Sequence, residues 1–244
     1  MHQVAGPQVD VHVHSLASGH AYSTIEEIAR AAAARGLAGV AITDHGPALP
    51  GGPHFYHFMA LRFVPEELFG VRLLRGVEAN ILDEGRLDLA AEVLERLDIV
   101  LAGFHEGCGY QGDSRRQNTA TLLRVMENPQ VDIISHPGNP QFPLDYAAVV
   151  AQAGRTGVAL EINSSSFSLS RRNSAPNCLE IVRLCARQGV AVAVGSDAHI
   201  AQGVGQFDDA LQALEQCGLP PELVVNRTLA STRAFLGRNG RMLR

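Results

Sequence analysis

The chain has 244 residues, of which 46% are hydrophobic and 18% charged, a composition that predicts a globular protein with a substantial buried core. Its formal net charge is −5, and all 20 basic residues are arginines, so we expect no general attraction to long nucleic acids or anionic membranes. The four cysteines show no C-x-x-C spacing, and no signal peptide or stretch of ~20 apolar residues is found. We therefore expect a cytoplasmic protein with reduced thiols.

Short apolar, β-branched runs alternate along the chain with longer segments of helical period. Seven such runs are predicted strands: 9–13, 38–43, 72–79, 98–104, 131–136, 158–163 and 190–196. Repeated strand–helix units of this kind form a parallel sheet, and strands that are apolar on both sides are buried on both faces. The pattern predicts an α/β fold, either a βα barrel or a doubly wound sheet, and we expect one domain over residues 1–244.

Two predicted helices have recognisable ends. Ser23 and Thr24, each three residues before a glutamate, predict a helix start by capping boxes, and Gly36 predicts its end. A second helix is predicted from about Gln206 to Gly218. The long stretch 46–65 is predicted to be an irregular rim or lid, because loops of that length inside a compact domain usually have a function.

Potential metal ligands lie at the end of six of the seven predicted strands or directly after it. They are His12 and His14, Asp44 and His45, Glu78, His105, His136, and Asp197 and His199. The carboxyl ends of parallel strands lie at one face of a sheet or barrel, so these side chains should meet although they are far apart in sequence. A purely structural protein gains nothing from this placement, which therefore predicts a metal site.

The pair His12 and His14 fits one ion, because residues two apart in a strand point to the same side. Alone, H-x-H is a weak motif. It becomes a specific one together with TDH at 43–45, GVEAN at 76–80, SHPGN at 135–139 and GSDAH at 195–199.

An ordered series of such motifs resembles the PHP superfamily of metal-dependent phosphoesterases, and within it the YcdX-type phosphatases. The matching segments run nearly from end to end: HVHSLASGHAYS, AITDHGP, PHFYHF, LLRGVEANI, AGFHE, ISHPGNP, ALEINSSSF and GSDAH. The resemblance implies a distorted, TIM-like (β/α)7 barrel with its metal site at the carboxyl ends of the strands.

The resemblance also implies three metal ions. His12, His14, Glu78 and Asp197 would hold the first, and Glu78 would bridge to a second held by His105 and His136. His20, His45 and His199 would hold the third. The catalytic residues are expected among these, namely Glu78, His20, His45 and Asp197. Imidazole-rich coordination favours Zn²⁺, with Mn²⁺ or Fe²⁺ as alternatives where carboxylates join.

Such a site would hydrolyse a small phosphomonoester with a metal-activated hydroxide, because bound divalent ions lower the pKa of water and offset phosphoryl charge. Substrate contacts are expected from Arg62, His57 and Asn163, with a turn-forming role as an equal alternative for Asn163. His54 and His57 are equally expected to pack on the barrel, and Arg171 and Arg172 to bind phosphate or form a solvated turn. Asp44 is expected to orient a ligand imidazole. His2 is given no role.

Three alternatives stay open at this point. Amidohydrolases also have H-x-H on the first strand, but their common binuclear form uses a carbamylated lysine, and this chain has none. A nuclease-type phosphodiesterase would keep the site, although the negative net charge argues against long polymers. A non-catalytic metal-binding protein is the third. The substrate and the oligomeric state, a homo-oligomer included, cannot be read from the sequence.

Overall fold

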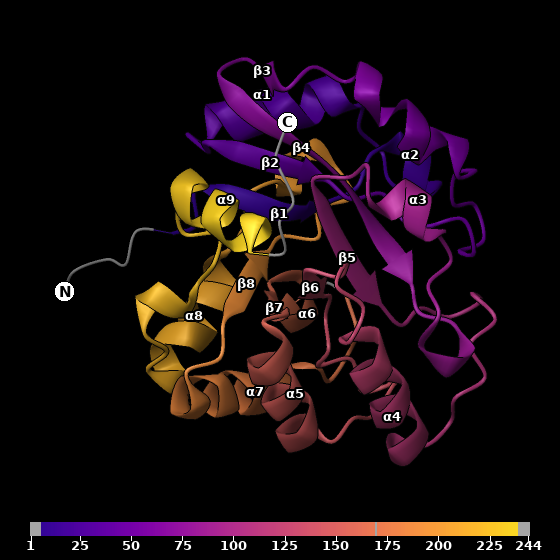
Figure 1. Ribbon diagram of the computed structural model, residues 1–244. Coiled ribbons are helices and arrows are strands. Elements are labelled where there is room, and N and C mark those ends of the chain that lie inside the picture. The colour runs from indigo at the N-terminus through magenta and orange to yellow at the C-terminus, as the bar shows by residue number, and fades with distance from the viewer. Residues whose placement is uncertain (1–5, 169, 239–244) are drawn as a thin grey trace.

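Seven parallel strands form the centre of the computed structural model, which describes residues 6–168 and 170–238 (Figure 1). They are β1 (Val9–Val13), β2 (Gly39–Ile42), β4 (Val71–Asn80), β5 (Ile99–Gly103), β6 (Ile133–Ile134), β7 (Ala159–Asn163) and β8 (Val192–Gly195). Neighbours in this order pair in parallel, as expected for strand–helix repeats. The seven predicted strands are confirmed as a nearly closed, TIM-like barrel.

The longer helices lie outside the strands, and in Figure 1 α4, α5, α7 and α8 follow one another around one side of the barrel. The helices are α1 (Ile25–Ala34), α2 (Tyr56–Ala60), α3 (Ala91–Leu94), α4 (Arg115–Val125), α5 (Tyr146–Thr156), α6 (Ser165–Ser168), α7 (Ala175–Gln188), α8 (Asp208–Cys217) and α9 (Leu229–Gly237). Within residues 6–168 and 170–238, none of them has the length and apolar character needed to span a bilayer.

Inside the barrel, buried side chains from every parallel strand form one apolar layer. These side chains are Val9, Val11, Ala41, Leu74, Ile99, Leu101, Ile133, Ala159 and Ala193. Val225 and Leu236 pack against them, so the segment that ends in α9 covers the amino end of the barrel. This apolar layer leaves the carboxyl ends of the strands for polar side chains.

Two local predictions need correction, and one short strand was not predicted. Helix α1 has one capping box, between Thr24 and Glu27, whereas the Ser23 hydroxyl accepts a hydrogen bond from Ala201 N at 2.9 Å instead. The stretch 46–65 is not wholly irregular, because it contains α2 and a 3-10 turn at Leu61–Phe63. A two-residue strand, β3 (Glu67–Leu68), pairs antiparallel with β4 and is too short to give a periodic signal.

The seam between β1 and β8 lacks a regular ladder and is held largely by side chains. Asn226, fully buried, accepts a hydrogen bond from Val194 N at 3.0 Å and donates to the carbonyl oxygens of Val9 and Val194, each at 2.7 Å. Nearer the carboxyl end, the Asp10 carboxylate accepts hydrogen bonds from Ser196 and Gly205. The barrel is therefore distorted at the point where its first and last strands meet.

We expect Asn226→Ala to lower the free energy of unfolding by about 3 kcal/mol or more, because it leaves buried backbone groups of Val9 and Val194 unpaired at about 1–3 kcal/mol each. Urea unfolding measures this. Asn128→Ala is the control, since the half-buried Asn128 side chain accepts a single bond, from Gln130 N. Equal losses in the two variants would contradict the role given to Asn226.

Candidate metal centre

The first group of predicted ligands meets at the carboxyl end of the seam. His12 lies in β1, His14 follows that strand, Glu78 lies in β4, and Asp197 follows β8. Asp197 N donates to His12 O and His14 N donates to Ala198 O, each at 2.9 Å, so the backbone of the two strands fixes these positions. Asp197 has a φ of +56°, an uncommon conformation for a residue with a side chain and one often found at functional sites.

The donor atoms of this first group are spaced as ligands of one ion would be. His12 Nε2 lies 3.0 Å from His14 Nε2, 3.2 Å from Glu78 Oε2 and 3.6 Å from Asp197 Oδ1. His14 Nε2 lies 3.5 Å from Glu78 Oε2 and 3.3 Å from Asp197 Oδ1. Ligands at the corners of a tetrahedron, each about 2.0–2.1 Å from Zn²⁺, are about 3.3–3.4 Å apart. The five separations bracket that value.

Two carboxylate oxygens in this group lack a hydrogen-bond partner. Glu78 Oε2 and Asp197 Oδ1 are buried, and neither receives a hydrogen bond from the described residues. Burying an unpaired carboxylate oxygen is costly unless a cation compensates it. A divalent ion fits this place, because it would satisfy both oxygens at once.

The second group uses the other oxygen of Glu78. His136 Nε2 lies 2.7 Å and His105 Nε2 lies 3.2 Å from Glu78 Oε1, and the two imidazole nitrogens are 3.1 Å apart. His136, after β6, also has a positive φ, of +32°. Glu78 thus faces both groups, as a bridging carboxylate would.

The third group lies nearer the surface. His20 is exposed and the side chain of His199 is 30% exposed, and their Nε2 atoms are 3.0 Å apart. The His45 ring stacks on that of His20 with centroids 5.1 Å apart, but its Nδ1 lies 3.0 Å from Glu78 Oε2. His45 belongs to two sets of three residues whose potential ligand atoms lie within 4.8 Å of one another. One set joins it with His14 and His199, and the other joins it with Glu78 and His105. His45 therefore lies between the groups.

Electrostatics keep the carboxylates charged. Although burial by itself raises the pKa of Glu78, the positive charges of the surrounding histidines hold it well below 4.5. Burial likewise opposes ionisation of Asp197, but Arg171 and His12 hold its pKa well below 3.8. Burial by itself lowers the pKa of His12, yet the charges of Glu161, Glu78 and Asp197 raise it well above 6.5. Glu78 and Asp197 are therefore ionised at neutral pH, the form in which carboxylates bind metal ions.

Asp44 is connected to the predicted ligand His14 through the Ser18 hydroxyl. The Ser18 hydroxyl donates to Asp44 Oδ1 at 2.7 Å and lies 3.0 Å from His14 Nδ1, so it is free to accept from that nitrogen. Burial opposes ionisation of Asp44, but hydrogen bonds from His57, Ser18 and Ser15 and the charge of His14 hold its pKa at about 2. Burial and the charges of neighbouring histidines lower the pKa of His14 to about 3, so this imidazole stays in the neutral form that binds metals.

The predicted substrate-binding residues differ in their surroundings. Asn163 is buried and donates to Asp197 Oδ2 at 3.2 Å, whereas His57 Nε2 lies 3.2 Å from Asp44 Oδ2. Arg62 is exposed with its guanidinium over the Phe63 ring, and in the described part of the chain it contacts none of the predicted metal ligands. His54 is also exposed, and His2 lies outside the described residues.

Arg171 and Arg172 differ clearly in their exposure and contacts. Arg171, with 16% of its side chain exposed, donates from Nη1 to Asp197 Oδ2 at 2.8 Å, while Arg172 is exposed. Arg171 also has a φ of +52°. The guanidinium thus lies at the edge of the first ligand group, with other N–H donors left to offer.

Sequence reasoning missed Glu161. This residue of β7 is 1% exposed and contacts His12, the backbone of His136 and Asn163 through its two carboxylate oxygens. A signal was present, because Glu161 is the one charged residue in the apolar run 158–163 and lies two residues before Asn163, on the same side of the strand. Ser18 was missed as well, and nothing in its local sequence marks it.

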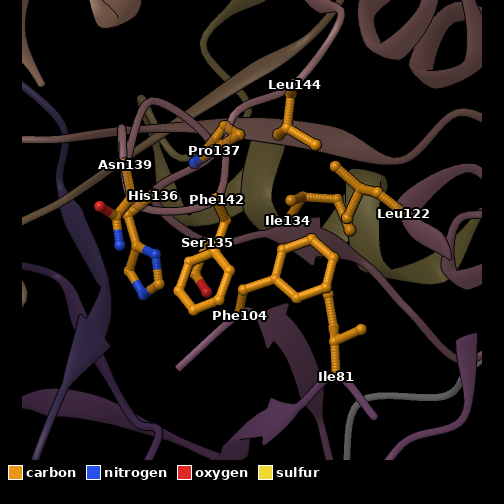
Figure 2. Close-up of a pocket in the computed structure, with 10 residues that line it drawn as sticks. All are labelled: Ile81, Phe104, Leu122, Ile134, Ser135, His136, Pro137, Asn139, Phe142 and Leu144. Atoms are coloured by element: carbon orange, nitrogen blue, oxygen red, sulfur yellow. The ribbon is translucent and has the colours of Figure 1, made fainter. Parts of the chain in front are cut away.

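Neither of two hollows in the structure contains the metal ligands as a set. A cavity of about 10 Å³ lies behind His136, where Figure 2 shows Ser135 beside the rings of Phe104 and Phe142; it has room for about one water molecule. A wider groove is lined by Gln8, Arg35 and residues of α8, near the amino ends of β1 and β2. Apart from His136, which lines the small cavity, the predicted metal ligands lie outside both hollows.

Comparison with known proteins identifies the family of this chain. A family model described as the PHP domain matches residues 10–218. A protein of Syntrophotalea carbinolica named probable phosphatase is 57% identical, over 95% of this chain and 97% of the relative. One of Acetivibrio thermocellus with the same name is 48% identical, over 97% and 98% of the two chains.

Among solved structures, the histidinol phosphate phosphatase of Lactococcus lactis, in complex with zinc, L-histidinol and phosphate, has a TM-score of 0.61 at 17% identity. The match covers 87% of this chain and 94% of that one. At such low identity the likeness shows the fold, whereas the family model covers most of the chain. This chain belongs to the PHP family.

Proposed function

We propose that this protein hydrolyses a small phosphomonoester with the help of divalent metal ions, three per chain, held by the three ligand groups. The observation that supports it best is the pair of buried oxygens, Glu78 Oε2 and Asp197 Oδ1, that lack hydrogen bonds and lie 3.0–3.6 Å from imidazole nitrogens. Relatives that match nearly end to end are named probable phosphatases, which supports a hydrolase of phosphoric esters.

The ligand types favour Zn²⁺, with Mn²⁺ or Fe²⁺ as alternatives. Bound ions would lower the pKa of water to about 7 and offset the charge on the phosphoryl oxygens. Glu78 would fix the spacing of the first two groups, because each of its oxygens faces one of them. His20 and His199 lie closest to solvent and would meet the phosphate first.

Arg171 would orient the phosphate. Its Nη1 is engaged by Asp197, but a guanidinium has five N–H donors in a planar fork that matches phosphate oxygens. Its position beside Asp197 would direct these donors toward a phosphate bound at the ligand groups. We place the reaction in the cytoplasm, an assignment supported by the four cysteines, which are all free thiols.

The experiment is hydrolysis of a generic aryl phosphate by the purified protein, before and after chelation. We expect activity that chelator removes and added Zn²⁺ or Mn²⁺ restores, followed by preference for one compound in a panel of phosphomonoesters. Retention of full activity by metal-free protein would refute the proposal. Bound metal with no hydrolysis of any phosphoester would favour a non-catalytic metal site instead.

A further inference from the structure

We infer that Glu161 is a positioning residue that holds the first two ligand groups together and sets the strength of metal binding in both. This inference rests on the proposed metal-dependent function. Glu161 lies on β7, between the strands that precede His136 and Asp197, and its carboxylate is buried. It is itself no member of the close-packed ligand sets.

One oxygen of Glu161 fixes the ring of His12. Glu161 Oε1 lies 2.7 Å from His12 Nδ1, and both side chains are fully buried. An ionised carboxylate only accepts hydrogen bonds, so Nδ1 must be the donor. The lone pair of the ligating form of His12 is then on Nε2, the atom that faces Glu78 and Asp197.

The other oxygen fixes the backbone of His136. Glu161 Oε2 accepts from His136 N at 2.8 Å and from the Asn163 amide at 3.2 Å. His136 has a φ of +32°, which a residue with a side chain adopts only when its surroundings hold it. The bond from its N–H is one such restraint, and it aims His136 Nε2 at Glu78 Oε1.

Gly195 makes room for this carboxylate. A Cβ atom at position 195 would lie 2.2 Å from Glu161 Oε1 and 2.7 Å from His12 Cβ. The backbone of β8 therefore packs directly against the Glu161–His12 contact. Both side chains are confined to one arrangement by the strand beside them.

A glutamine cannot replace Glu161 in this place. If its carbonyl oxygen accepted from His12, its NH2 group would face the N–H donors of His136 and Asn163. If the amide were flipped, NH2 would face His12 Nδ1 and shift the ring proton to Nε2, the atom that must bind metal. One of the two ligand groups is misdirected in either case, and the carboxylate charge is lost for both.

The test is calorimetric titration of metal-free protein with Zn²⁺, comparing Glu161→Gln with the wild type. Changes to residues that orient metal ligands typically weaken metal affinity by about 10–100-fold. We expect Glu161→Gln to weaken at least two binding steps by this factor.

Asp132→Asn is the matched control. Asp132 is a fully buried carboxylate in the barrel wall at the amino end of β6, and it accepts a hydrogen bond from Val100 N. It should change stability without changing Zn²⁺ binding. Unchanged binding in Glu161→Gln, or a loss no larger than in Asp132→Asn, would overturn the inference, as would the weakening of a single step.

Circular dichroism establishes that each variant is folded. If Glu161→Gln does not fold, Glu161→Asp provides the same test, because its shorter side chain keeps the charge but cannot reach both His12 and His136. Glu161→Asp should weaken at least one Zn²⁺-binding step tenfold. Zn²⁺ binding as tight as that of the wild type would overturn the inference. A wild-type protein that binds no metal would instead refute the proposed function, and the inference with it.

Discussion

Glu78→Ala should reduce the rate of phosphomonoester hydrolysis by at least about 10³-fold. Loss of a single group that stabilises charge in a transition state typically costs 10²–10³-fold, and Glu78 serves two ligand groups. Its Oε1 lies within 3.2 Å of His105 and His136, and its Oε2 lies within 3.5 Å of His12 and His14. Steady-state kinetics measures the loss, and elemental analysis of the same sample measures bound metal.

Glu78→Gln separates ligation from packing, because it keeps the size of the side chain but offers one oxygen in place of two. We expect it to retain metal in one of the two groups and to lose most of the activity. Normal activity with full metal content in Glu78→Ala would refute the bridging role of this residue.

Arg171→Ala should lower kcat/KM for a phosphomonoester by about 10²–10³-fold. Truncating one partner of a buried, hydrogen-bonded charge pair costs about 2–5 kcal/mol, and here the substrate phosphate would lose the same guanidinium. KM and kcat should both change, since Arg171 also holds Asp197 Oδ2. Inhibition by inorganic phosphate should weaken in parallel.

Arg172→Ala is the matched control for this prediction. Arg172 is the next residue in the chain and is exposed, so its loss removes the same charge from the same turn without touching Asp197. We expect its kinetics to stay within about twofold of the wild type. Equal losses in the two variants would mean that the turn acts only through its general positive charge.

The order of strands and the convergence of the proposed ligands could be predicted because both depend on local pattern and one topological rule. Apolar runs mark buried strands, and the carboxyl ends of parallel strands meet at one face. The side chains of four residues converge as that rule requires, namely His12, Glu78, His136 and Asp197. The first and the last of these are more than a hundred positions apart in the sequence.

Features that depend on contacts between distant side chains could not be predicted. Asn226 closes the seam by bonding two strands more than 30 positions away, and the alternating pattern contains no trace of it. Arg171 and Arg172 are equivalent as neighbours in sequence, and only the turn, with its positive φ at Arg171, directs one of them to Asp197. Glu161 was visible as a charge in an apolar strand, but its partners on β1 and after β6 were not.

The assignment of His45 shows another limit. The resemblance groups it with His20 and His199, and its ring does stack on His20. Its Nδ1 nevertheless lies 3.0 Å from Glu78, so spacing alone does not decide which group it joins. Three ions sharing nine ligands remain a proposal that metal titration addresses directly.

Titration of metal-free protein with Zn²⁺, with phosphate release followed at each addition, tests the central claim most directly. The account predicts no hydrolysis without metal and a rise in rate that levels off at three equivalents per chain, because the first two groups share Glu78 and the third faces the substrate. Full hydrolysis by metal-free protein, or saturation with Zn²⁺ and no hydrolysis of any phosphomonoester, would contradict it.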